Sequence, residues 1–133
     1  MSHELTENQV IEFAAAQLKD QGWTVKEQRK DRERGIDLLA EDGNKLKWYF
    51  EAKGSIGNNG KNKNRGFDSS ALAILRCLKF YSDKKADRAC VLVPDSARFS
   101  EVLNGDTCTQ LAKVGVHVWF VSKDRIRKWP DMN

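Results

Sequence analysis

Three side chains near the middle of the chain have the types that metal-assisted phosphate chemistry uses: Asp37, Glu51 and Lys53. Glu51 and Lys53 belong to one Glu-Ala-Lys tripeptide, so in an extended strand their side chains point to the same face, about 7 Å apart. Mg²⁺ prefers oxygen ligands and usually keeps several waters beside one or two carboxylates and a substrate phosphate. A lysine at this position would orient a water or neutralise charge that builds up on the phosphate.

Two predicted strands must carry these side chains. Residues 36–40 are predicted to form one strand and residues 46–52 the next, joined by a turn of the Asp-Gly type. Such a hairpin places Asp37 opposite a residue near 48–50 and therefore within reach of Glu51 across the ladder. Two turn centres fit the sequence, so the register is left open.

An ordinary salt bridge at a strand edge is the competing interpretation of the Glu-Ala-Lys tripeptide. Charged residues at the end of an otherwise buried strand are costly unless they are paired or bind a metal. Asp37, one hairpin earlier, and a basic segment directly after Lys53 favour a functional site over the salt bridge.

The basic segment spans residues 54–66 and contains four glycines, four asparagines and three cations. We expect a flexible loop in which Lys61, Lys63 and Arg65 bind the phosphate backbone of a nucleic acid, assisted by Asn side chains and Gly amides. A solvated loop without a ligand is the alternative. Residues 125–128 contain a second group of cations that is a weaker candidate for nucleic-acid contact.

The elements around the hairpin are predicted to alternate between helix and strand. Thr6 and Gln9 form a capping-box pattern at the start of a helix over residues 7–21. The elements predicted after the hairpin are a helix over 70–83 that buries Leu72, Leu75, Leu78 and Phe80, a buried strand at 89–93, a helical region over 99–113 interrupted near Gly105, and a buried strand at 116–121. This order predicts an α/β domain whose mixed sheet is flanked by helices on both faces.

The ordered pattern resembles the PD-(D/E)xK nuclease superfamily. Gly35-x-Asp37 is followed fourteen residues later by Glu51-Ala-Lys53, on a hairpin preceded by a helix. Within the superfamily, the arrangement is similar to that of archaeal Holliday-junction resolvases and Mrr-like restriction endonuclease domains, over roughly residues 7–93. The resemblance implies a restriction-endonuclease-like fold and a Mg²⁺-dependent nuclease, expected to be an endonuclease, that hydrolyses phosphodiester bonds in DNA, with Mn²⁺ as a substitute ion.

The resemblance also implies roles for individual residues. Asp37 and Glu51 would be metal ligands, the carbonyl of Ala52 a further ligand, and Lys53 the catalytic base or charge stabiliser. The sequence departs from the literal motif, because Ile36 precedes Asp37 where the family name implies proline. That substitution affects turn geometry rather than metal ligation.

A glutamate on the first helix often completes the site in this superfamily. Glu12 is the best match for it, because it lies ten residues before the glycine that ends the predicted helix, and Glu7 is the alternative. Either glutamate would also fit an ordinary solvated helix face.

Length and composition bound the remaining possibilities. The 133 residues, 40% of them hydrophobic, fit a single domain over 1–133, and a net charge of +4 permits a polyanionic partner. No apolar run is long enough to span a membrane and no signal-peptide pattern is present, so we expect a cytoplasmic protein. Three widely spaced cysteines and two histidines argue against a disulfide framework and a zinc site.

The expected partner is DNA, with RNA left open and no membrane contact. One domain of this kind has one cleavage centre, so cutting both strands of a duplex requires a homodimer or two successive events. A non-cleaving nucleic-acid-binding or interaction module on the same fold is the alternative function. Other enzyme classes lack support, because the sequence contains neither a GxxxxGK[ST] phosphate loop nor a Gly-x-Ser-x-Gly elbow.

Overall fold

A computed structural model describes residues 4–30, 36–56 and 66–129. These residues form a six-stranded mixed sheet and four helices, in agreement with the predicted mixed α/β class. The elements are α1 (Glu7–Asp20), β1 (Thr24–Gln28), β2 (Leu38–Glu41), β3 (Lys47–Ala52), α2 (Gly66–Ser82), β4 (Arg88–Pro94), α3 (Ala97–Val102), α4 (Gly105–Lys113), β5 (Val116–Val121) and β6 (Ile126–Trp129).

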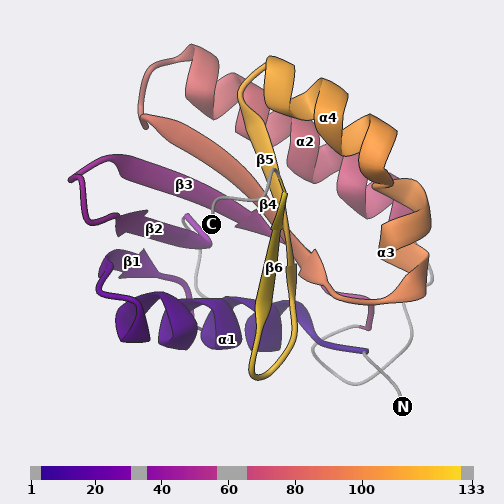
Figure 1. Cartoon of the computed structure of the whole chain (residues 1–133), viewed down its shortest axis with the longest axis horizontal. Helices are drawn as coiled ribbons and strands as arrows, with labels where there is room; N and C mark the ends of the chain where they lie inside the picture. The colour runs from indigo at the N-terminus through magenta and orange to yellow at the C-terminus, as the bar shows by residue number, and fades with distance from the viewer. Residues whose placement is uncertain (1–3, 31–35, 57–65, 130–133) are drawn as a thin grey trace.

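The strands follow one another across the sheet in chain order from β1 to β6. β3 pairs parallel with β4, and β4 pairs parallel with β5, while the other neighbouring strands are antiparallel. Parallel neighbours require a crossover, and the crossovers here contain α2 and then α3 with α4. These three helices cover one face of the sheet and α1 covers the other, as predicted (Figure 1).

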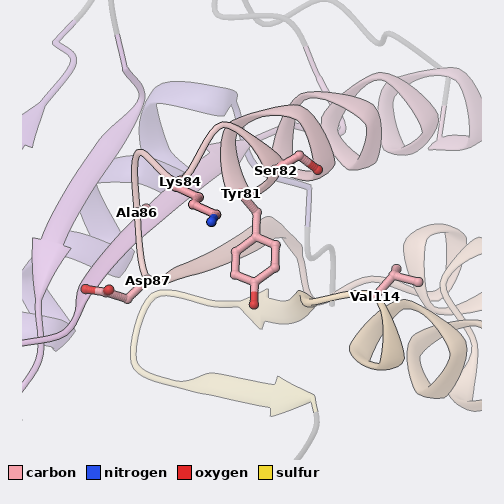
Figure 2. A pocket seen from close by; sticks show the side chains of 6 residues that line it. All are labelled: Tyr81, Ser82, Lys84, Ala86, Asp87 and Val114. Carbon is pink, nitrogen blue, oxygen red and sulfur yellow. The ribbon is translucent and has the colours of Figure 1, made fainter.

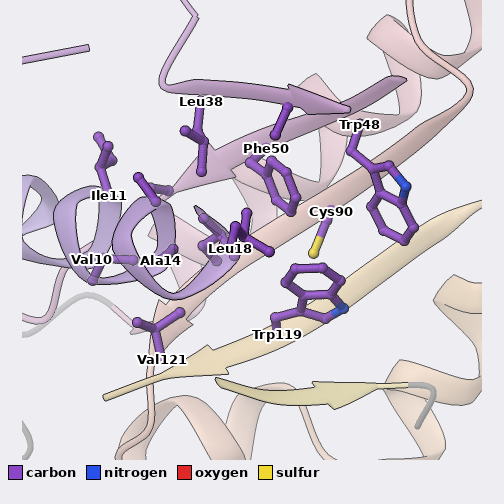
Figure 3. Packing of buried hydrophobic residues seen from close by; sticks show 14 residues of the cluster. Val10, Ile11, Ala14, Leu18, Leu38, Trp48, Phe50, Cys90, Trp119 and Val121 are labelled. Atoms are coloured by element: carbon purple, nitrogen blue, oxygen red, sulfur yellow. The ribbon is translucent and has the colours of Figure 1, made fainter. Parts of the chain in front are cut away.

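The face under α1 holds an aromatic core (Figure 3). Val10, Ala14 and Leu18 are four residues apart on α1, and each is fully buried, which is the spacing of one helix face. They pack over a layer of the sheet in which the rings of Trp48 and Trp119 lie 5.2 Å apart, centroid to centroid. This packing fixes α1 against the strands that carry the candidate site.

The capping box at the start of α1 is confirmed. The Thr6 hydroxyl accepts a hydrogen bond from the Gln9 backbone N–H at 3.0 Å, and the Gln9 side chain accepts one from the Thr6 N–H at 2.9 Å. The helix therefore begins at Glu7, and it ends before Gly22, which has a positive φ of 90°. The first carboxylate of α1 is thus held at a defined position.

The face that α2 buries differs from the prediction. Leu72 and Leu75 are 43% and 64% exposed, whereas Ala73 and Cys77 are fully buried. Residues 73 and 77 are one turn apart, and their small side chains let the helix axis approach the sheet closely. The larger residues Leu78 and Phe80 pack at the edge of this contact, as predicted.

The end of the described chain forms a strand that the basic composition did not predict. β6 pairs antiparallel with β5, with Lys128 opposite Trp119. The Nζ atom of Lys128 lies 4.6 Å from the centroid of the Trp119 ring, and Arg127 forms an ion pair with Asp95 at 2.9 Å. These two cations of the second basic group therefore have partners within the protein.

The three cysteines, Cys77, Cys90 and Cys108, are all buried and free. Cys90 belongs to the core on the α1 face, while Cys77 and Cys108 belong to the core on the opposite face. Within the described ranges, none of the helices is both long and apolar enough to cross a membrane.

Candidate active site

The β2–β3 hairpin sets the register of the site. Leu38 pairs opposite Phe50. Asp37 precedes Leu38 and Glu51 follows Phe50, so the two carboxylates belong to the same level of the ladder. The Asp37 Oδ2 atom also accepts a hydrogen bond from the backbone N–H of Ala52 at 2.8 Å.

The hairpin loop is longer than the Asp-Gly pattern predicts. Glu41 and Lys47 are the last paired residues, and the five residues 42–46 form the loop between them. The Asp42 carboxylate accepts hydrogen bonds from two backbone N–H groups inside the loop, both at 2.9 Å. The expectation that Asp37 faces a residue near 48–50 is therefore wrong by at least one position. Asp37 lies at the level of Glu51 instead.

Asp37 is almost completely buried, with 3% of its surface exposed. Its Oδ1 atom forms an ion pair with the Arg29 Nη1 atom at 2.8 Å. Burial raises the pKa of Asp37 to about 7, and the negative charge of Glu51 is the second cause of the increase. The N–H of Ala52 and the charge of Arg29 act in the opposite direction. Two carboxylates thus lie close together where water screens their charges poorly.

Glu51 is buried as well, with 5% of its surface exposed. The Tyr49 hydroxyl donates a hydrogen bond to its Oε1 atom at 2.5 Å, and the Arg76 Nη1 atom of α2 lies 3.2 Å from its Oε2 atom. The Tyr49 ring stacks on Phe80 with centroids 3.9 Å apart. Burial raises the pKa of Tyr49 well above its ordinary value, so the hydroxyl remains a donor.

A third carboxylate reaches this cluster from α1, and it is Glu7. Its Oε2 atom lies 2.6 Å from Arg29 Nη2, and its Oε1 atom lies 3.8 Å from Lys53 Nζ. Glu12, the preferred candidate from the sequence, is exposed and contacts no member of the cluster in the described part of the chain. Five residues turn a helix by about 140° beyond a full turn, so both glutamates cannot face the sheet end.

The close approach that brings Glu7 to Lys53 depends on Gly54. A Cβ atom at this position would lie 2.4 Å from the Glu7 backbone N and 2.7 Å from the Thr6 carbonyl carbon. Real Cβ atoms essentially never approach backbone this closely. The start of α1 therefore packs directly on the chain that follows Lys53.

Residues 54–56 are held in place, contrary to the prediction of a flexible loop over 54–66. The Ser55 N–H donates to the Leu5 carbonyl at 2.9 Å, and the Leu5 N–H donates to the Ser55 hydroxyl at 3.0 Å. Ile56 forms an isolated parallel bridge with Thr6. The remaining basic segment, with Lys61, Lys63 and Arg65, lies outside the described residues.

The carboxylates of the cluster are suitable ligands for a hard divalent cation, but arginine side chains already contact them. The carboxylates of Glu7, Asp37 and Glu51 offer only oxygen atoms, which Mg²⁺ prefers as ligands. Besides burial, the negative charge of Glu51 disfavours the ionised form of Asp37. In this conformation Arg29 and Arg76 neutralise the carboxylates. Among the described residues, no three His, Cys, Asp or Glu side chains form a ready-made metal site.

Sequence reasoning missed three donors of this cluster: Arg29, Tyr49 and Arg76. Tyr49 could have been found, because residues two apart on a strand share a face and Glu51 is its neighbour on that face. Arg29 belongs to a mixed-charge stretch that is more often solvated, and Arg76 comes from a helix twenty-five residues after Glu51. No local pattern connects either arginine to the site.

A surface hollow of about 500 Å³ lies elsewhere, at the C-terminal end of α2 (Figure 2). It is lined by Tyr81, Ser82, Lys84, Ala86, Asp87 and Val114. Asp87 contacts the start of β3, through its N–H to the Lys47 carbonyl, whereas the carboxylate cluster lies at the end of that strand. Four residue rises along β3, roughly 13 Å, separate Lys47 from Glu51, so the hollow is not part of the cluster.

The chain matches no protein-family model, and no match was found among curated proteins or among solved structures.

Proposed function

We propose that the chain is a divalent-metal-dependent nuclease that hydrolyses phosphodiester bonds within DNA strands. Asp37 and Glu51 would hold a Mg²⁺ or Mn²⁺ ion, with the Ala52 carbonyl as a further ligand, and Lys53 would act on the attacking water. Glu7 takes the place that the sequence suggested for Glu12. The finer description of the fold as restriction-endonuclease-like belongs to the same proposal.

The observation that carries the proposal is the pair of buried carboxylates at one level of the hairpin. Burial raises the pKa of Asp37 to about 7, and the negative charge of Glu51 contributes to the increase. Such a pair is unfavourable for a purely structural element, and a bound divalent cation would relieve the repulsion. Strongly perturbed groups that cluster in this way are a common mark of functional sites.

Lys53 is well positioned to act on a reactant at the strand end. Its backbone N–H donates to the Leu92 carbonyl at 2.9 Å, which fixes the chain where β3 ends. Its Nζ atom is 3.8 Å from Glu7, a distance that leaves the ammonium free to donate to a water or a phosphate oxygen. When bound, the metal ion would polarise the phosphate and lower the pKa of a coordinated water.

The substrate class rests on the cations that follow the site. The segment with Lys61, Lys63 and Arg65 begins directly after Ile56, whose bridge to Thr6 lies next to Glu7. Cations attached at this point would supply salt-dependent affinity for a phosphate backbone without reading sequence. DNA is the proposed polymer, RNA is the competing substrate in the test, and a homodimer would supply two cleavage centres.

The proposal is tested by incubating the protein with supercoiled, linear, single-stranded and branched DNA and with RNA, in Mg²⁺ and in Mn²⁺. Wild-type protein should cleave at least one DNA form, and Lys53→Ala should lose about 100-fold or more of the rate. Lys47→Ala is the matched control, because Lys47 is an exposed lysine at the opposite end of β3. Equal cleavage by wild type and Lys53→Ala would refute the assigned role.

A non-cleaving nucleic-acid-binding or interaction module is the second candidate, and one observation favours it. Arg29 and Arg76 already neutralise Asp37 and Glu51, so the cluster is satisfied without a metal. This candidate predicts DNA binding that persists in EDTA, together with no product from any substrate in either metal. A binding assay run beside the cleavage assay separates the two functions.

A further inference from the structure

The Arg29 guanidinium lies between two carboxylates of the candidate site. Its Nη1 atom is 2.8 Å from Asp37 Oδ1 and its Nη2 atom is 2.6 Å from Glu7 Oε2, with 18% of the side chain exposed. The Arg29 backbone N–H also donates to the Asp37 carbonyl at 3.0 Å. This one side chain therefore joins α1 to the hairpin.

The atoms of Asp37 show why this position matters for a metal ion. Oδ2 is engaged by the backbone N–H of Ala52, which cannot move without disturbing β3. Oδ1 is the other carboxylate oxygen, and it is contacted by the side chain of Arg29. A divalent ion bound at Oδ1 would lie within a few ångströms of a fixed positive charge.

The formal charges of the cluster also bear on whether a metal ion can bind beside Arg29. Its three carboxylates, on Glu7, Asp37 and Glu51, face three cations, on Arg29, Lys53 and Arg76. The cluster is formally neutral, and a divalent ion would leave it with an excess of two positive charges. Either an arginine must withdraw or an anion must arrive.

The Arg29 side chain is also incompletely satisfied where it lies. Its Nε atom is buried and has no hydrogen-bond partner among the described residues. A guanidinium carries five N–H donors, and a buried donor without a partner is costly. Release of the side chain would let Nε bond to water, in exchange for the contacts of the guanidinium with Glu7 and Asp37.

We infer that Arg29 occupies the place of a divalent cation between Glu7 and Asp37 in the metal-free protein. Metal binding displaces the guanidinium from Asp37 Oδ1, and the released side chain can then bind a phosphate oxygen of the substrate. This inference rests on the proposed function and adds the regulation of its site. It gives the chain a metal affinity that is held low until a phosphate anion offers Arg29 a new partner.

The test is calorimetric titration of Mg²⁺ into full-length protein without nucleic acid. Arg29→Met should bind Mg²⁺ at least about tenfold more tightly than wild type, because the competing charge is gone. Arg127→Met is the matched control, since Arg127 pairs with Asp95 at 2.9 Å and contacts none of the three carboxylates; its Mg²⁺ affinity should equal that of wild type. Asp37→Ala should abolish binding.

The outcomes separate the inference from the proposed function. Equal or weaker Mg²⁺ binding by Arg29→Met, with binding still lost in Asp37→Ala, overturns the displacement and leaves the metal site intact. No Mg²⁺ binding by either wild type or Arg29→Met overturns both. If Arg29→Met fails to fold, the guanidinium nitrogen resonances of Arg29 in wild type decide: they should shift on saturation with Mg²⁺, and unchanged resonances overturn the inference.

Discussion

Replacing Gly54 with alanine would place a methyl group against the backbone that carries Glu7. The added Cβ atom would lie 2.4 Å from the Glu7 N, 2.7 Å from the Thr6 carbonyl carbon and 2.8 Å from the Leu5 carbonyl oxygen. All three contacts are with backbone atoms, so no side-chain rotation can relieve them. The start of α1 must move away from the end of β3.

The expected destabilisation follows from this overlap. Forcing one extra carbon into a packed contact typically costs about 1–3 kcal/mol, and in a domain of this size that lowers the midpoint of thermal unfolding by roughly 3–10 °C. Thermal unfolding followed by circular dichroism measures the shift. The same variant should lose part of its Mg²⁺ affinity in calorimetric titration, because Glu7 moves with the helix.

Gly43→Ala is the matched control for this experiment. Gly43 lies in the β2–β3 loop, and an added Cβ atom there meets nothing within 4 Å. Its midpoint should stay within about 2 °C of wild type. A Gly54→Ala protein that unfolds at the wild-type temperature would refute the claim that the start of α1 packs directly on residue 54.

Two further predictions concern buried polar groups. Tyr49→Phe removes the donor to Glu51 Oε1 but keeps the ring, so the free energy of unfolding measured in urea should fall by about 1–2 kcal/mol; an unchanged value would contradict the bond's role in holding Glu51. Burial lowers the pKa of His117, and the charge of Arg88 lowers it further, so the imidazole binds a proton more readily in the unfolded chain than in the folded one. Stability due to neutral His117 is therefore lost as the pH falls through about 6.5, and His117→Gln should lose less thermal stability than wild type on acidification; equal losses would count against this assignment.

Much of the fold follows from local patterns in the sequence. The capping box at Thr6 and the apolar spacing of α1 are short-range features, and the run at residues 89–93 is long and apolar enough to indicate a buried strand. The leucine spacing of α2 predicts the wrong buried face, because Leu72 and Leu75 are exposed and small residues of the helix face the sheet instead. Ala73 and Cys77 are buried since close packing on the sheet selects for small volume as well as for hydrophobicity.

The candidate site was predictable mainly in its hairpin. Asp37 and Glu51 are brought to one level by pairing of neighbouring strands, which sequence spacing largely determines. Glu7 lies one turn before Val10 on the buried face of α1 and Glu12 does not, so helical spacing favours Glu7. That this part of the helix meets Lys53 depends on contacts between Leu5 and Ser55, fifty residues apart in the chain. Contacts of that range depend on the completed packing, and no local pattern encodes them.

With Cys108 replaced by alanine, the two remaining buried cysteines, Cys77 and Cys90, would report transient opening of the two faces of the sheet. Cys90 lies beneath α1, and Cys77 is on the sheet-facing side of α2. Burial raises the pKa of both thiols, so neither reacts with an alkylating reagent while its layer is closed. The rate at which each thiol is labelled therefore measures how often its own face of the sheet opens. Unequal rates would mean that the two layers open separately, and equal rates that the domain opens as one unit.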